Sequence, residues 1–319
     1  MAASSTITCH IFWELQTLSF FIRTTRQFIE LRRRHRDTEV CFQSMRLHTY
    51  VVLVYPLASF MPEPTINGLL TWLDQSPTPF HVVQTASASL DTVGFTRVLE
   101  LGNEIPDLGY LAHDGCIIAW RLGSAKGSLR IIGAHTDSPN LRVLPQPDIH
   151  QLGWSQLAIE IYGGVLLNSW LDRDLGIAGR VIDSSGISHL YSAPQAIARI
   201  PQLAIHLDRE VNDKGLILNR HQHLSPVWAL GTSASSFETW LAQQCSVSPS
   251  QIASWSAQLV DTQKAEIFGR DSEFVASSRI DNQISCWAAL AALLACTGDQ
   301  PMMIALFDHE EVGSQSSQG

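Results

Sequence analysis

Three features that would place the sequence in a common class of protein are missing from it. No two of its six cysteines have the Cys-x-x-Cys spacing of zinc ribbons and redox motifs. The sequence has no Gly-x-Ser-x-Gly and no phosphate-loop signature, which disfavours a serine hydrolase and a P-loop nucleotide-binding protein. The formal net charge of −9 disfavours a nucleic-acid partner. Reduced thiols in a cytoplasmic protein are the simplest explanation of the cysteines.

Long apolar runs are missing as well. The apolar stretch at residues 50–60 contains Pro56 and is shorter than the roughly 20 residues that span a bilayer, so we expect no membrane partner. Residues 1–60 carry seven arginines and four acidic residues, a net +3, which leaves −12 for the rest. The Arg-rich run 32–36 would suit a basic patch or an organelle-targeting leader, but the acidic residues argue against a leader. We favour an upstream stretch translated from a wrongly assigned start, with Met61 as the functional first residue.

Near its end the sequence places two glutamates side by side. Glu310 and Glu311 follow the apolar run 302–307, which we predict to be a strand. One carboxylate of such a pair can bind a metal ion while its neighbour takes a proton from water, the two tasks of metal-assisted hydrolysis. Taken alone, the pair would more often be solvated surface residues, since glutamate is rarely buried.

Two further segments present residues of the metal-binding type. His135 and Asp137 follow the apolar stretch 129–132, which reads as a buried strand, and would lie at its carboxyl end, where active sites of open α/β sheets collect. An imidazole is a common zinc ligand, and a carboxylate two residues later can hold the ring in one tautomer. Asp281 precedes apolar residues with helical spacing and so lies where a helix begins; capping of that helix is the alternative.

The order of the predicted elements indicates an α/β sheet sandwich. Apolar residues with helical spacing predict a helix at 66–73 that ends before Pro77, and a second helix from Phe80 to near Gly94. Alternating or apolar runs predict strands at residues 95–101, 110–111 and 116–122, with a turn at 113–115 between the last two. His113 is therefore expected to be a turn residue.

The distance between the candidate segments predicts an inserted domain. His135 and Asp281 are separated by about 145 residues, far more than the roughly 4–6 residues of an ordinary connection. The intervening sequence fits a β-rich module, because residues 157–162 alternate and residues 163–164 and 183–186 have turn chemistry.

Four blocks of the sequence resemble, in order, the M18 family of metalloaminopeptidases, the aspartyl aminopeptidase group. They are AHTDSPNLRV (134–143), YGGVLLNSWLDRDLGIAGRV (162–181), SRIDN (278–282) and FDHEEVGSQSSQG (307–319). The resemblance runs from about Met61 to the last residue. It implies a zinc-peptidase-like α/β/α sandwich, incomplete in this chain, and an inserted β-rich domain.

The chemistry implied by this resemblance is removal of the N-terminal residue of a peptide by water activated between two zinc ions. His135 would ligate one zinc and Glu311 the other. Asp281 would bridge both, since only a carboxylate has two oxygens that two cations can share. Glu310 would be the general base, and Asp137 would steady the His135 ring.

The resemblance also implies a large homo-oligomer. It divides the chain into a catalytic domain at residues 61–145 and 256–319 and an inserted oligomerisation domain at residues 146–255; the extension at residues 1–60 is unlike the family. His206 matches a histidine that reaches into a neighbouring subunit's active site to contact substrate. A hydrogen-bonded structural histidine is the alternative.

The carboxyl end departs from the family pattern. In the family a further aspartate and a late histidine complete the two metal sites, and neither has a counterpart in this sequence. Each zinc would keep two protein ligands, whereas catalytic zinc normally has three plus water. We therefore expect a C-terminally truncated aminopeptidase with weak zinc binding and impaired activity. The alternative is an inactive fragment that retains only the capacity to fold or oligomerise.

Overall fold

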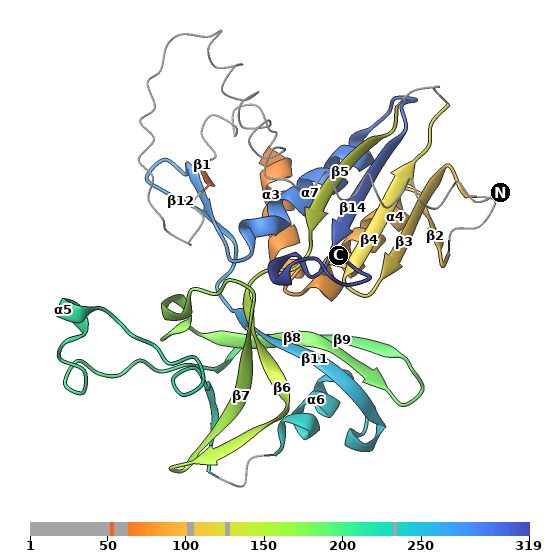
Figure 1. The fold of residues 1–319 in the computed structure, drawn as a ribbon. Coiled ribbons are helices and arrows are strands. Elements are labelled where there is room, and N and C mark those ends of the chain that lie inside the picture. Colours follow the sequence, from red (N-terminus) through yellow and green to blue (C-terminus); the bar gives the residue numbers. More distant parts are fainter. Residues whose placement is uncertain (1–51, 54–62, 101–104, 125–127, 232–234) are drawn as a thin grey trace. The chain divides into compact units, whose positions relative to one another are not determined.

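The computed structural model describes residues 52–53, 63–100, 105–124, 128–231 and 235–319. The predictions made for residues 1–60 lie outside these ranges, except that Val52–Leu53 form the short strand β1. Two larger sheets and one small sheet make up the described chain (Figure 1).

The sheet that carries the candidate site has five strands in the order β2-β3-β4-β14-β5. These strands are β2 (Thr96–Val98), β3 (Leu108–His113), β4 (Cys116–Arg121), β5 (Arg130–His135) and β14 (Met302–Phe307). β14 is antiparallel to β4 and parallel to β5, so the carboxyl ends of β14 and β5 lie at the same edge. β3 and β4 form a hairpin around the two-residue turn Asp114-Gly115, a dipeptide that favours tight hairpins.

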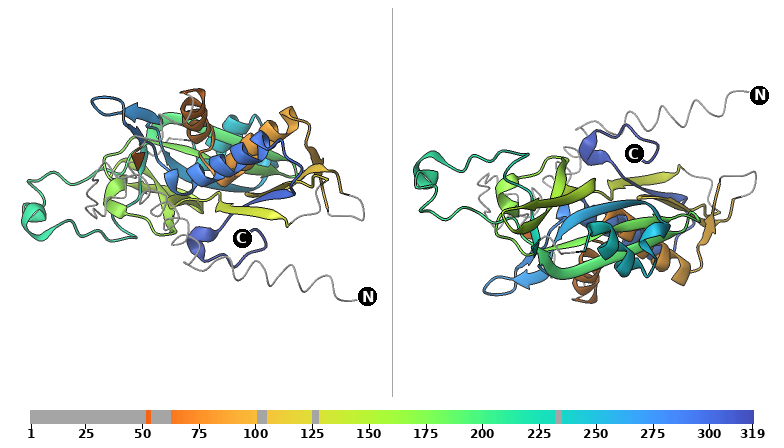
Figure 2. Two further views of the ribbon diagram at one scale, coloured as in Figure 1. Left: turned by 90° about the horizontal axis from the view of Figure 1, so that it is seen from above. Right: turned by 90° about the horizontal axis from the view of Figure 1, so that it is seen from below.

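A layer of three helices lies on one face of this sheet; the second and third contact its strands, and the first packs against the other two helices (Figures 1 and 2). They are α3 (Glu63–Gln75), α4 (Pro79–Thr92) and α7 (Ile280–Ala295). Thr78 caps α4 by accepting a hydrogen bond from the His81 amide, and the chain leaves the helix at Gly94, whose φ of 86° suits glycine. Apolar side chains of the helices and strands form a first core that includes Leu73, Leu90, Ile117, Leu293 and Leu306.

The second large sheet has six antiparallel strands in the order β10-β7-β6-β11-β8-β9. These strands are β6 (Asn140–Gln151), β7 (Trp154–Tyr162), β8 (Leu175–Asp183), β9 (Ser188–Ala198), β10 (Val227–Leu230) and β11 (Ile252–Asp261). Helix α6 (Phe237–Cys245) places Phe237 in a second core, where its ring stacks on Trp240 at 5.6 Å. The two sheets therefore have separate apolar cores.

The connection between β9 and β10, residues 199–226, is called the arm below. It contains the single helical turn α5 (Val211–Lys214) and extends away from the six-stranded sheet (Figure 1). Leu203, Leu207 and Ile217 on the arm are 63%, 75% and 82% exposed. The remaining elements are β12 (Glu266–Phe268), β13 (Phe274–Ala276) and the 3-10 turns η2 (Leu167–Trp170), η3 (Pro249–Gln251) and η4 (Glu310–Val312).

Most local predictions from the sequence are confirmed, including both helices, the hairpin turn and the turn at residues 183–186. The strand predicted at 129–132 exists as β5, but its description as buried is wrong. β5 pairs only with β14 among the described strands, so its residues are partly exposed. The six-stranded sheet begins at Asn140 and ends at Asp261. The bounds 146–255 of the inserted domain stay a prediction.

Candidate metal centre

The pairing of β5 with β14 brings the first two candidate segments together. His135 is the last residue of β5 and pairs with Phe307, the last residue of β14. The Thr136 amide donates to the Phe307 carbonyl oxygen at 2.7 Å, which continues the contact past the strand ends. The glutamate pair follows three residues later on the turn η4. Parallel pairing thus places an imidazole and two carboxylates at one edge of the sheet.

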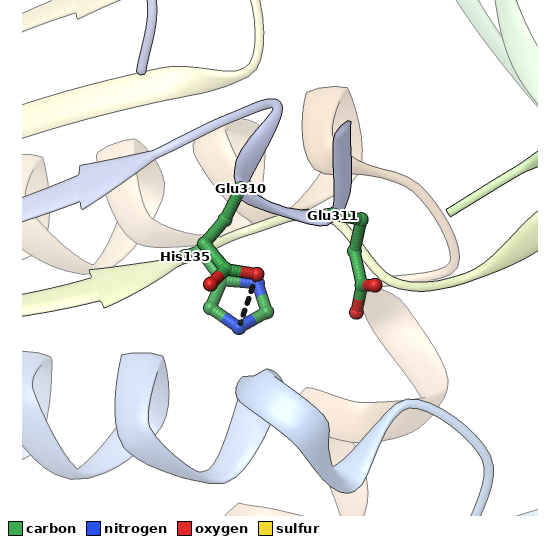
Figure 3. Close-up of side chains that lie close together, drawn as sticks. All are labelled: His135, Glu310 and Glu311. Carbon is green, nitrogen blue, oxygen red and sulfur yellow. Dashed lines mark ion pairs between the residues drawn. The ribbon is translucent and has the colours of Figure 1, made fainter. Parts of the chain in front are cut away.

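Three side chains converge at this edge. The nearest donor atoms of His135, Glu310 and Glu311 all lie within 4.8 Å of one another, a spacing that one metal ion can bridge. Figure 3 shows the Glu310 carboxylate against the imidazole ring and the Glu311 carboxylate to one side of it. His135 Nε2 lies 3.7 Å from Glu310 Oε2.

Asp281 adds a fourth side chain from the start of α7. Its Oδ1 lies 3.3 Å from His135 Nε2, although the two residues are far apart in the sequence. The φ and ψ angles of Asp281 and Asn282 are not helical, so the chain bends where it enters the helix. The prediction that Asp281 lies where a helix begins is confirmed. We call His135, Asp281, Glu310 and Glu311 the site cluster.

Asp137 is buried directly behind the cluster and makes four hydrogen bonds. It accepts from His135 Nδ1 at 3.2 Å, from the Tyr162 hydroxyl at 2.7 Å, and from the Glu310 and Glu311 amides at 3.3 and 3.1 Å. Burial alone would raise the pKa of Asp137, but the bonds from His135, Tyr162 and Glu311 lower it below its ordinary value. One ionised carboxylate thus ties the ring to the loop that carries both glutamates.

The bond to Asp137 also determines which ring nitrogen faces the cluster. When Nδ1 donates to Asp137, the Nε2 lone pair of the neutral ring points toward Asp281 and Glu310 and can bind a metal. Burial disfavours a charged ring, yet the bonds to Asp137 and Asp281 outweigh it and raise the pKa of His135 to about 10. In the metal-free chain at neutral pH, both ring nitrogens therefore carry a proton. A metal ion would have to displace the proton on Nε2.

The negative charge around the ring favours a cation. Burial raises the pKa of Glu311, and the neighbouring carboxylates of Asp137, Glu310 and Asp281 raise it further, against the lowering effect of His135. Nitrogen and carboxylate oxygen donors of this kind suit zinc. The residues present therefore fit a zinc ion in the chemistry of their donor atoms.

A cavity of about 390 Å³ opens beside the cluster. Asp281 and Glu311 lie at its wall, together with Ser138, Trp170 and Arg173. Neither Tyr162 nor this cavity was predicted from the sequence. Tyr162 ends an alternating strand beside two glycines, which is a visible signal, but its partner Asp137 could not be identified without the fold.

Two other histidines lie apart from the cluster. His206 is exposed on the arm and is not a member of the metal-type group of His135, Glu310 and Glu311. His113 ends β3 at the hairpin turn, as predicted, and its side chain is 65% exposed. Within one chain, the structure therefore brings His135, Asp137, Asp281, Glu310 and Glu311 together but leaves His206 outside.

Comparison with known proteins points to one family. The sequence profile described as "Aminopeptidase I zinc metalloprotease (M18)" matches residues 72–319. The chain is 43% identical over 265 residues to "Probable M18 family aminopeptidase 2" of Streptomyces coelicolor, covering 79% of this chain and 61% of that protein. Its counterpart in Ectopseudomonas mendocina is 40% identical, covering 81% of this chain and 64% of that protein. The chain spans about three fifths of the length of these relatives.

Solved structures share the fold. A chain of the cryo-EM structure of the Ape4 and Nbr1 complex is 29% identical with a TM-score of 0.74, over 80% of this chain and 56% of that one. A chain of the S. cerevisiae mApe1 dodecamer is 25% identical with a TM-score of 0.67, over 81% and 63%. An M18 aminopeptidase from Thermotoga maritima, 23% identical with a TM-score of 0.68 over 81% and 60%, shows the fold alone.

Proposed function

Because the chain belongs to the M18 family of zinc metalloproteases, we propose that it carries the metal centre of an aminopeptidase that removes the N-terminal residue of peptide substrates. The observation that carries the proposal is the convergence of His135, Asp281, Glu310 and Glu311 at the joint end of two parallel strands. Fold alone would not support a function, whereas these donors at this spacing fit a hydrolytic metal site.

Each residue of the cluster has a proposed task. His135 Nε2 and the Glu311 carboxylate would each hold one zinc ion, and Asp281 would be shared between the two ions. Zinc, when bound, supplies a Lewis acid that polarises the scissile carbonyl and lowers the pKa of water. Glu310 is 54% exposed and lies against the ring, so its carboxylate can take a proton from the attacking water and return it to the leaving amine. Asp137 would hold His135 in the tautomer that frees Nε2.

The number of ligands limits the proposed activity. With Asp281 shared, the site cluster in the described part of the chain offers two protein ligands to each ion, one fewer than catalytic zinc usually has. The matched region covers 61% and 64% of the length of the two relatives. We therefore propose weak zinc binding and low turnover for the isolated chain. The alternative is an inactive fragment.

A homo-oligomer is the proposed assembly. The apolar residues Leu203, Leu207 and Ile217 of the arm are exposed in the single chain, as expected for a surface that a second copy covers. A solved relative is named as a dodecamer, which supports the same proposal. His206 lies on this arm and would contact the substrate bound by a neighbouring subunit.

Location in the cytoplasm is a further part of the proposal. Cys116, Cys245, Cys286 and Cys296 are free thiols in the described chain, as expected for a reducing compartment. Of the described helices, none is both long and apolar enough to cross a bilayer.

Zinc content and turnover measured on one preparation test the function. We expect the purified chain to bind zinc and to release the N-terminal residue of a chromogenic peptide slowly. The Glu310→Gln variant should keep its zinc and lose turnover, because the general base is absent while the ligands remain. A chain that binds no zinc and releases no amino acid would be the inactive fragment.

A further inference from the structure

The proposed metal ligands come from segments that are not continuous in the chain. His135 follows β5, Asp281 opens α7, and the glutamate pair follows β14. A metal site needs its donors at fixed spacing, so something must hold these three elements in register. We infer that Gln283, with Trp72 behind it, is a positioning residue that sets the distance between the His135 and Asp281 halves of the proposed centre.

Gln283 has no exposed surface and uses both ends of its side-chain amide. Its Nε2 donates to the Thr136 carbonyl oxygen at 2.6 Å, and its Oε1 accepts from Trp72 Nε1 at 3.2 Å. An indole N–H can only donate and a carbonyl oxygen can only accept, so this arrangement fixes the orientation of the amide. Glutamine has both functions in one planar group, and leucine of similar size would leave both partners buried without a bond.

Thr136 carries the connection onward to the third element. Its carbonyl oxygen receives the Gln283 bond, while its amide donates to the Phe307 carbonyl oxygen at 2.7 Å. Its hydroxyl, itself almost fully buried, donates to the Gly115 carbonyl oxygen at 2.7 Å. A single residue next to His135 is therefore bonded both to the helix of Asp281 and to the strand that leads to the glutamates.

Two further bonds join the same pair of segments. The Ser138 hydroxyl donates to the Asp281 carbonyl oxygen at 2.8 Å, and the Cys286 thiol donates to the His135 carbonyl oxygen at 3.0 Å. Gln283 lies between these two bonds in the sequence of α7. It is the member with a partner outside the two segments, since Trp72 belongs to α3 and is packed in the first core. Trp72 thus connects the position of the Gln283 amide to the helix layer.

The test uses Gln283→Leu and Trp72→Phe, with a substitution of Trp120 in the five-stranded sheet as the matched control. Trp120 Nε1 donates to the Pro106 carbonyl oxygen at 2.9 Å, and Trp120 is as buried as Trp72 but belongs to β4, away from the cluster. Trp72→Phe and Trp120→Phe therefore remove the same kind of bond at two places. Cobalt(II) replaces zinc as the probe, because its visible absorption reports the geometry of the ligands.

We expect Gln283→Leu to bind cobalt about tenfold more weakly and with an altered visible spectrum, in the range usual for partners that orient ligands. Trp72→Phe should weaken binding about threefold, and Trp120→Phe should leave affinity and spectrum unchanged even if it lowers thermal stability. Unchanged cobalt affinity and spectrum in Gln283→Leu would overturn the inference. If that variant does not fold, equal cobalt binding by the two Trp→Phe variants would overturn it.

The inference rests on the proposed function, and the two can fail separately. If the wild-type chain binds no cobalt, the proposed metal centre is wrong. Hydrogen exchange then still tests the positioning role: Gln283→Leu should speed exchange at residues 135–138 and 281–286 together, and Trp120→Phe should not. Equal exchange in both variants would mean that Gln283 does not hold the two segments in register.

Discussion

The two large sheets hold their side chains in place by different means. At the end of the five-stranded sheet, buried polar groups of Thr136, Asp137 and Gln283 make hydrogen bonds that join separate elements. The six-stranded sheet instead packs on an aromatic core in which Phe237 contacts Trp240, Trp228 and Trp255. Hydrogen bonds fix directions and apolar contacts mainly fix volume. Hydrogen-bonded packing suits a site that must orient ligand atoms. Apolar packing suits a region that only has to be stable.

Removal of the His135 ring should have the largest effect on the metal centre. We expect His135→Ala to weaken zinc binding on the order of 100-fold or more and to abolish turnover, because it removes a ligand and one of the four hydrogen bonds that Asp137 accepts. Zinc titration by calorimetry measures the loss. His113→Ala removes an exposed histidine from the same sheet and should change neither quantity. Equal zinc affinity in the two variants would place the metal elsewhere.

The corresponding change in the six-stranded sheet should lower stability and leave the site intact. Phe237 is fully buried and its amide donates to Asp148, so Phe237→Ala leaves a cavity in the second core. Loss of a buried phenylalanine costs about 3–5 kcal/mol in the free energy of unfolding. Urea denaturation measures that loss. Zinc affinity per folded chain should change less than twofold, and a large change would show that the two cores are not independent.

Acid should separate the two regions. Burial, and next to it the charge of Arg279, lower the pKa of His81 from 6.5 to about 4 in the folded chain. The unfolded chain binds this proton more readily, so the stabilisation is complete above about pH 6.5 and falls as the pH drops toward 4. Between pH 7.5 and 5 the change amounts to about 2 kcal/mol. Urea midpoints of wild type and His81→Gln over this range measure it, and parallel pH dependence of the two proteins would contradict it.

The six-stranded sheet should resist the same acidification. The hydrogen bond from His189, with those from Ser185 and Ile187, keeps the pKa of Asp183 well below its usual range. A lowered carboxyl pKa gives stability that is present above pH 3.8 and lost only as the pH falls through the folded value. Hydrogen exchange at pH 5 should therefore increase first around α4, not in the β8–β9 hairpin.

How far the sequence predicts this molecule depends on whether partners are near in the chain. The first two helices follow from apolar spacing and from Pro77 and Gly94, and the hairpin turn follows from Asp114-Gly115, since each signal is local. The partly exposed edge position of β5 does not follow, because it depends on a pairing with β14, which lies about 170 residues away.

The candidate site likewise combines features with a local sequence signal and features that depend on distant partners. The residue types and spacing of His135, Asp281 and the glutamate pair suggested metal chemistry, and resemblance to a family gave each a role. The bonds that Gln283 makes to Trp72 and Thr136 could not be predicted, since glutamine at a helix start reads as a solvent-facing residue. Asp137 could be predicted to hold the His135 ring because it lies two residues away in the sequence, whereas Gln283 lies 147 residues from its partner Thr136.

The smallest effect on the single chain should come from the arm. Leu207 is 75% exposed, so Leu207→Ser should change the free energy of unfolding by less than about 0.5 kcal/mol. If a second copy covers the arm, the same substitution should shift the oligomer toward smaller species in sedimentation velocity. Leu152→Ser, at a position that is 90% exposed in the turn between β6 and β7, is the matched control outside the arm. Equal sedimentation of the two variants would mean that the arm's apolar residues face solvent in the assembled protein, and His206 would then have no neighbouring site to reach.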